Sequence, residues 1–82
     1  MTLFKRLDEL HTTPLGLVRI KDNLGLDDEI DVVKYCKKII KDSSTIVERI
    51  GKNYYATSAK GKITINASKM SIITAHQVKN IK

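Results

Sequence analysis

Apolar residues recur with helical spacing in the first half of the chain and with strand spacing in the second half. In residues 1–42 the apolar positions repeat at intervals of three and four, the period of one helix face. In residues 45–79 they alternate with polar positions, so that neighbouring side chains point to opposite faces of a strand. The pattern predicts an α+β domain, with N-terminal helices packed on one face of a four-stranded antiparallel β-meander.

Three amphipathic helices are predicted in residues 1–42. The second begins at Pro14 behind the capping hydroxyl of Thr13, and it ends at Gly25. The acidic run 27–29 is expected to open the third helix, because negative charge suits a helix N-terminus. The expected buried stripes are Leu3, Leu7 and Leu10, then Leu17, Ile20 and Leu24, and finally Val32, Val33, Cys36, Ile39 and Ile40.

The four strands are predicted at residues 45–50, 53–59, 62–67 and 71–78, with a tight turn expected at 60–61. Helices on one face leave the other face free, and we call it the open sheet face. On the last strand we expect Ile73 and Ala75 to point toward the helices. The side chains expected on the open sheet face are Thr64, Asn66, Ser68, Thr74, His76, one of Tyr54 and Tyr55, and Arg49 if Ile46 and Ile50 are buried.

Length and composition limit the class of protein. Eighty-two residues are enough for one domain, 1–82, made of a helical half (1–42) and a sheet half (45–79). No apolar run has the roughly 18 residues of a membrane span and the start lacks a signal-peptide core, so we expect a cytoplasmic protein. The single cysteine, Cys36, excludes an internal disulfide and a multi-cysteine zinc site. We therefore expect neither a metal nor a cofactor.

The net charge of +6 is distributed unevenly along the chain. Residues 1–41 hold eight basic and seven acidic side chains, whereas residues 42–82 hold seven basic and two acidic ones. A local basic surplus is typical of a surface that meets phosphate, although it also serves solubility. The expected partner is RNA, or another phosphate-bearing or acidic molecule.

Two histidines, His11 and His76, are candidates for general acid–base chemistry, because imidazole titrates near neutral pH. If they met across the open sheet face, Arg49 or Lys52 would supply the cation that stabilises a phosphorane during RNA cleavage. The alternatives are structural, with His11 at a helix end and His76 in a local hydrogen bond.

Tyr54 and Tyr55 follow Arg49 and Lys52 in the sequence. Aromatic rings stack on unpaired bases while neighbouring cations hold phosphates, so this stretch is a candidate RNA contact. Equally, one tyrosine must pack inward, and the other can simply cover a small core.

Three stretches, LHTTPLGLVRIKDNLGL (10–26), DVVKYCKKII (31–40) and IGKNYYATSAKGKITINASKMSIITAH (50–76), resemble a small bacterial family, the domain of unknown function 3781. The resemblance implies a bacterial or phage source and no activity. The residues that stand where the family's polar pattern lies are His11, Thr12, Thr13, Gly16, Arg19, Asn23, Asn66, Thr74 and His76.

The predicted order of helices and strands is also similar to the barnase, colicin and RelE-like ribonuclease toxins. That similarity implies metal-independent RNA cleavage on the open sheet face, although the only strand carboxylate here is Glu48. One hypothesis is therefore a ribonuclease or RNase-like toxin that uses His11, His76 and Arg49. The other is a non-catalytic module that binds nucleic acid, a phosphorylated ligand or an acidic protein, and a homo-oligomeric structural protein is the third alternative. The candidate binding residues are Thr12, Thr13, Arg19, Lys52, Tyr54, Tyr55, Asn66, Ser68 and Thr74.

Overall fold

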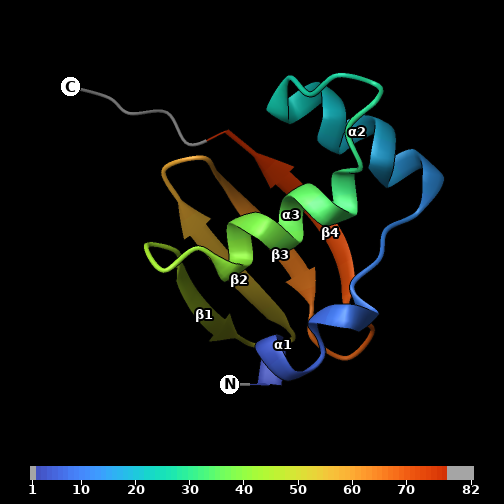
Figure 1. Ribbon diagram of the computed structural model, residues 1–82. Coiled ribbons are helices and arrows are strands. Elements are labelled where there is room, and N and C mark those ends of the chain that lie inside the picture. Colours follow the sequence, from blue (N-terminus) through green and yellow to red (C-terminus); the bar gives the residue numbers. More distant parts are fainter. Residues whose placement is uncertain (1, 78–82) are drawn as a thin grey trace.

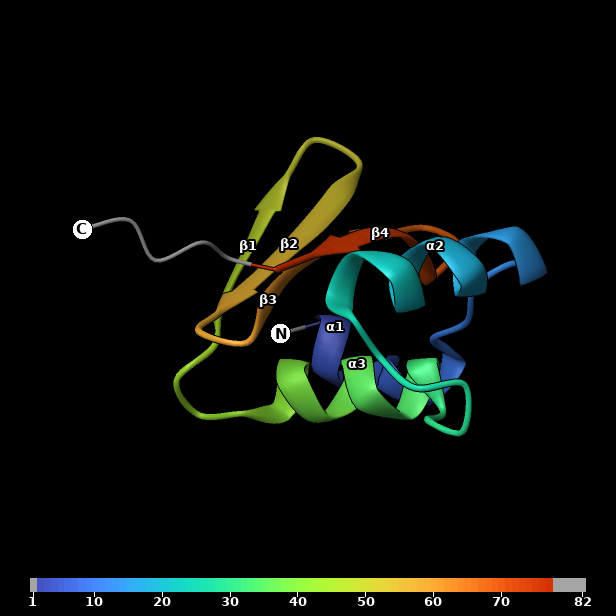
Figure 2. The same cartoon turned by 90° about the horizontal axis from the view of Figure 1, so that it is seen from above.

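The computed structural model describes residues 2–77, in which all helices lie on one face of a four-stranded antiparallel sheet (Figures 1 and 2). This confirms the predicted fold class. The elements are α1 (Thr2–Lys5), the 3-10 helix η1 (Leu7–Glu9), α2 (Pro14–Leu24), α3 (Val32–Lys41), β1 (Ile46–Ile50), β2 (Asn53–Ser58), β3 (Gly61–Asn66) and β4 (Ser71–His76). Residues 78 and 79, predicted to belong to the last strand and the sheet half, lie outside the described residues. Within residues 2–77 no helix combines the length and the apolar character needed to cross a membrane.

Helix α2 begins and ends as its sequence predicts. The hydroxyl of Thr13 accepts a hydrogen bond from the backbone N–H of Gly16 at 3.0 Å, and Pro14 occupies the first helical position. At the other end Gly25 adopts φ +66°, the left-handed conformation that favours glycine. Local capping chemistry therefore sets both ends of this helix.

Helix α3 begins later than predicted. The carboxylate of Asp31 accepts a hydrogen bond from the backbone N–H of Lys34 at 3.1 Å and so caps the helix. The acidic run 27–29 instead lies in a turn, closed by a hydrogen bond from the Ile30 N–H to the Asp27 carbonyl. The prediction was wrong because a cap needs one carboxylate in the right geometry, which a general preference for negative charge does not supply.

The first predicted helix is divided into α1 and η1, with the break at Arg6. The Arg6 guanidinium reaches the turn after β3 and donates hydrogen bonds to the carbonyls of Ala67 (3.1 Å) and Ser68 (3.2 Å). It also pairs with the carboxylate of Glu9 at 3.1 Å. The division leaves the predicted leucine stripe intact, because Leu3, Leu7 and Leu10 are all buried.

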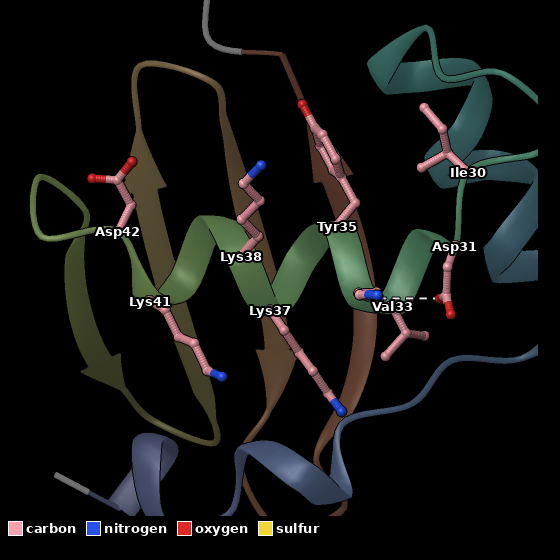
Figure 3. Close-up of a pocket in the computed structure, with 9 residues that line it drawn as sticks. Ile30, Asp31, Val33, Tyr35, Lys37, Lys38, Lys41 and Asp42 are labelled. Carbon is pink, nitrogen blue, oxygen red and sulfur yellow. Dashed lines mark hydrogen bonds between the residues drawn. The ribbon is translucent and has the colours of Figure 1, made fainter.

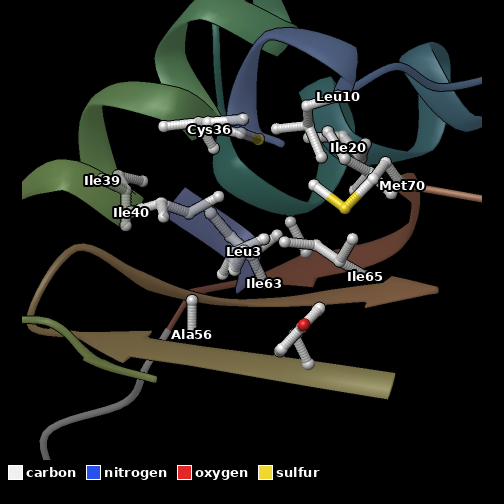
Figure 4. Close-up of a cluster of buried hydrophobic side chains, with 14 of the residues drawn as sticks. Leu3, Leu10, Ile20, Cys36, Ile39, Ile40, Ala56, Ile63, Ile65 and Met70 are labelled. Carbon is white, nitrogen blue, oxygen red and sulfur yellow. The ribbon is translucent and has the colours of Figure 1, made fainter. Parts of the chain in front are cut away.

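One hydrophobic core joins the helices to the sheet (Figure 4). It contains side chains from α1, η1, α2 and α3 and from β2, β3 and β4. Tyr54 is part of this core at 3% exposure. From β1 only Val47 packs against the core, and it is half-buried.

A β-bulge in β4 changes which side chains of this strand point toward the helices. Thr64 pairs with Thr74 and Ile65 with Ile72, so Ile73 is an extra residue without a partner on β3. Ile72 is therefore buried and Ile73 is 51% exposed, contrary to the expectation that Ile73 points toward the helices. Ala75 is buried as predicted. A strict alternation of two cannot anticipate an inserted residue.

Within residues 2–77 one edge of the sheet is covered by other parts of the chain, and the other edge is not. Beside β4, His11 forms a parallel bridge with Ser71, in which the His11 N–H donates to the Met70 carbonyl and the Ile72 N–H donates to the His11 carbonyl. Helix α2 also packs along β4 (Figure 1). On the other side β1 is an edge strand, and no element of residues 2–77 pairs with its outer side.

Candidate functional site

The open sheet face is centred on Tyr55. The ammonium of Lys62 lies 5.3 Å from the centroid of the Tyr55 ring, and the amide of Asn53 donates to the Tyr55 hydroxyl at 3.2 Å. Thr64 and Thr74 follow in the same cross-strand row. The row also includes Glu48, which pairs directly with Tyr55 from β1. Glu48 and Lys62 offset each other, so the charge on this face is close to balanced.

Arg49 does not lie on the open sheet face. It pairs with buried Tyr54, and its guanidinium carbon lies 5.3 Å from the centroid of that ring on the helix side of the sheet. Its Nε donates to the Gly51 carbonyl at 2.9 Å. The prediction depended on burial of Ile46 and Ile50, which are 66% and 60% exposed. It failed because β1 is an edge strand with neither face fully buried.

His11 and His76 are not brought together. His11 bridges Ser71 at the start of β4, and His76 is the last residue of that strand. At about 3.3 Å per residue, five residues separate the two backbone positions by about 16 Å. The His11 Nδ1 lies 3.0 Å from the Glu9 carbonyl, and the His76 Nε2 lies 3.4 Å from the Thr74 hydroxyl. Both exposed rings therefore make local contacts at opposite ends of a strand.

Thr12 and Thr13 hold the scaffold together. The hydroxyl of Thr12 donates to the Ile72 carbonyl at 3.3 Å and so joins the N-terminal segment to β4. Thr13 caps α2. A β-carbon at Gly16 would overlap the Thr12 hydroxyl, so the close approach of these two residues requires glycine. Part of the family-like polar pattern thus has a structural explanation.

Asn66 and Ser68 shape the turn between β3 and β4. The Asn66 Oδ1 accepts hydrogen bonds from the Ser68 N–H, the Ser68 hydroxyl and the Lys69 N–H, all at 3.0–3.1 Å. Of the other candidate binding residues, Tyr54 is buried, Arg19 is exposed on α2, and Lys52 is exposed in the turn between β1 and β2. Of the candidate site residues, Tyr55, Asn66, Thr74 and His76 lie on the open sheet face.

A denser basic surface lies on α3, on the opposite side of the molecule. Four lysines stand at helix positions i, i+3, i+4 and i+7 and form one face, which we call the α3 lysine stripe: Lys34, Lys37, Lys38 and Lys41. All four line a shallow pocket along α3, and Figure 3 shows Lys37, Lys38 and Lys41 projecting from the helix. Within residues 2–77 none of their ammonium groups has a hydrogen-bond or ion-pair partner. The ion pair in this part of the chain joins Arg6 to Glu9.

The carboxylates at the two ends of α3 are already engaged. Asp31 caps the N-terminus, and Asp42 accepts hydrogen bonds from the Ser44 N–H (2.9 Å) and the Ser44 hydroxyl (2.8 Å). These bonds to Ser44 lower the pKa of Asp42, because they stabilise its charged form. Both carboxylates thus hold local structure.

The α3 lysine stripe has an energetic cost. Its members form like-charge pairs three and four residues apart, each of which destabilises a helix by about 0.2–0.5 kcal/mol. The helix dipole favours Lys38 and Lys41 in the last turn, but it gives no such benefit to Lys34 and Lys37. Helix stability therefore accounts for Lys38 and Lys41 but not for Lys34 and Lys37.

The net basic surplus lies in residues 42–82, but a sum over each half of the chain does not reveal the local cluster of lysines on α3. The acidic residues of the N-terminal half lie mainly in η1 and in the turn before α3. They balance the lysines of α3 in the net charge of that half, but they do not lie beside those lysines on the helix face. The signal that would have identified the stripe is its own helical spacing, since lysines at i, i+3, i+4 and i+7 must share one face.

Cys36 does not contribute a reactive thiol. Burial in the core raises the pKa of Cys36 to about 12, because the charged thiolate would lose its hydration. Residues 2–77 contain no cluster of three or more histidine, cysteine, aspartate or glutamate side chains arranged to hold a metal ion.

Comparison with known proteins identifies the family of the chain. The profile of the family described as "Protein of unknown function (DUF3781)" matches residues 4–76, which include every helix from η1 onward and all four strands. No curated protein and no solved structure matches the chain. The match extends over most of the sequence, and the chain therefore belongs to the DUF3781 family.

Proposed function

We propose that this protein is a non-catalytic RNA-binding module whose α3 lysine stripe contacts the phosphate backbone. The observation that carries the proposal is the set of four lysines on one helix face with no carboxylate partner among residues 2–77. Unneutralised lysines attract polyanions and release the counterions condensed on them, which is the main source of sequence-independent affinity. We place this module in the cytoplasm, where RNA is abundant.

The dimensions of the stripe suit several neighbouring phosphates. Lys34 and Lys41 are seven residues apart, which corresponds to about 10 Å along the helix axis. α3, with the sequence VVKYCKKIIK, contains no arginine, asparagine or glutamine, the side chains whose forked donors read base edges. We therefore expect binding that depends on charge and very little on base sequence.

The ribonuclease alternative is less well supported. Acid–base cleavage needs two groups within reach of one scissile bond, whereas His11 and His76 stand at the two ends of β4. Arg49, the cation assigned to the phosphorane, points to the helix side of the sheet. Binding without cleavage requires none of these groups to meet.

Two variants with equal loss of charge test the proposal. Lys37→Gln/Lys38→Gln neutralises half of the stripe, and glutamine maintains helix propensity. Lys52→Gln/Lys62→Gln removes the same charge from the sheet half, from the turn between β1 and β2 and from β3, and Lys62 is the cation over the Tyr55 ring. Affinity for a 20-nucleotide RNA is measured by fluorescence anisotropy at about 0.15 M salt. The loss of two phosphate contacts is expected to weaken binding by about 15-fold, and the sheet variant should change it by less than about threefold.

The opposite ranking of the two variants would assign binding to the open sheet face and overturn the proposal. An acidic protein surface is the alternative occupant of the stripe. Competition separates the two polyanions: RNA should displace the labelled RNA more effectively than poly-L-glutamate at the same concentration of charges. A better competition by poly-L-glutamate would identify an acidic protein as the partner and contradict the assignment to RNA.

A further inference from the structure

The fold closes one edge of its sheet and leaves the other open. The β4 edge is covered by the His11 bridge, by the Thr12 hydroxyl on the Ile72 carbonyl and by α2. The β1 edge has no such cover from any element of residues 2–77. An uncovered edge strand presents unpaired backbone N–H and C=O groups, which can pair with a further strand.

The side chains of β1 are unusually apolar for an exposed strand. Ile46 and Ile50 point to the open sheet face and are 66% and 60% exposed, and they flank Glu48. Tyr55 lies beside them on β2, opposite Glu48. Within the described residues Glu48 has no ion-pair partner. The edge therefore presents an apolar–acidic–apolar row next to an aromatic ring.

We propose that β1 binds an extended segment of a partner protein as a fifth strand of the sheet. The segment is expected to carry a basic residue opposite Glu48, with apolar residues two positions to either side opposite Ile46 and Ile50. Backbone hydrogen bonds supply affinity in this mode of recognition, and alternate side chains supply specificity. Opposite charges directly across a strand pair stabilise it, and like charges destabilise it.

A second copy of this chain fits the edge less well. Antiparallel self-pairing about a two-fold axis normal to the sheet places equivalent faces side by side. The register that pairs all five residues of β1 sets Ile46 opposite Ile50 and Glu48 opposite its own copy. Two carboxylates would then face each other, which disfavours self-pairing and favours a different protein with a basic residue at that position.

This surface is separate from the α3 lysine stripe. Helix α3 packs on β2, and β1 contributes only half-buried Val47 to the core. The inference therefore does not rest on RNA binding. Failure of strand binding at β1 can be distinguished from failure of RNA binding, because variants of the α3 lysine stripe are expected to leave peptide binding at β1 unchanged.

Two synthetic peptides serve as probes, with the sequences TITKTIT and TITETIT, which differ only in the central charge. Titration into the isotope-labelled full chain, followed by amide chemical shifts, reports both affinity and location. We expect the lysine peptide to shift the β1 amides and to bind about two- to fivefold more tightly than the glutamate peptide. The variant Glu48→Lys should reverse this preference, whereas Glu29→Lys, an equal charge change in the turn before α3, should preserve it.

Three outcomes would overturn the inference. The first is the absence of β1 shifts with either peptide. The second is the same peptide preference in wild type and Glu48→Lys, which would show that the central charge is not recognised at Glu48. The third is a wild-type dimer in sedimentation velocity that Glu48→Gln strengthens, because removal of the facing carboxylates would favour pairing only if the occupant of the edge were a second copy.

Discussion

His11 and His76 lie at opposite ends of β4, with His11 bridged to Ser71 and His76 closing the strand. The strand thus separates the two imidazoles that would have formed an acid–base pair. The separation is fixed by backbone hydrogen bonds on both sides of His11, from its N–H to Met70 and from Ile72 to its carbonyl. This geometry favours a binding function over a catalytic one.

The first prediction concerns RNA integrity. Purified protein incubated with transfer RNA and total RNA in EDTA should leave both intact, because His11 and His76 stand at opposite ends of β4 and cannot act together on one scissile bond. Gel electrophoresis of the RNA provides the measurement, with His11→Ala and His76→Ala as matched samples. Cleavage by wild type that either substitution abolishes would contradict the binding assignment.

The second prediction concerns the contact between Gly16 and Thr12. Alanine normally stabilises a helix by about 1 kcal/mol relative to glycine. At this position the added β-carbon would overlap the Thr12 hydroxyl, and overpacking costs about 1–3 kcal/mol. Gly16→Ala should therefore lower the free energy of unfolding, as measured by urea denaturation. In a Thr12→Ala background the same substitution should be neutral or stabilising, and equal effects in the two backgrounds would refute the contact.

The third prediction separates structure from binding at Asn66. Because its side-chain oxygen accepts three hydrogen bonds in the turn, Asn66→Ala should reduce the free energy of unfolding by about 1–2 kcal/mol. Asn66→Asp retains the acceptor oxygen and should retain most of the stability. RNA affinity of the folded protein should be the same for both variants, and a selective loss of affinity in Asn66→Ala would restore this residue to the binding site.

The fourth prediction follows from the raised pKa of Cys36. The thiol should resist alkylation by iodoacetamide at neutral pH and should react only after denaturation, as mass spectrometry can show. Because the folded pKa of about 12 exceeds the ordinary value of 9.0, the thiol contributes stability that is complete below pH 9 and is lost as pH rises toward 12. Between those limits wild type should lose more unfolding free energy than Cys36→Ala, and parallel curves would contradict the burial.

Local signals predicted most of the fold. The Thr13 cap, Pro14 and Gly25 defined α2 because each acts within a few residues of its own position. Alternation of apolar and polar residues located the strands to within about two residues. The bulge at Ile73 had no such signal, because pairing with β3 creates it. The turn at residues 27–30 was not predicted either, because it depends on Asp31, and not the acidic run before it, capping α3.

The candidate site was less predictable, because it depends on tertiary contacts. Arg49 was misplaced because alternation cannot indicate the inward face of an edge strand that is exposed on both faces. The distance between His11 and His76 depends on a bridge between segments 60 residues apart. The α3 lysine stripe was present in the sequence as a spacing, yet a charge sum over half of the chain concealed it.

The salt dependence of RNA binding tests the central claim most directly. Affinity for a single-stranded RNA of about 20 nucleotides is measured between about 50 and 200 mM KCl for wild type and for Lys37→Gln/Lys38→Gln. Four phosphate contacts predict a slope of log affinity against log salt near −2.8, and two contacts predict a slope near −1.4. A slope that is the same for both proteins, or close to zero for wild type, would contradict binding through the α3 lysine stripe.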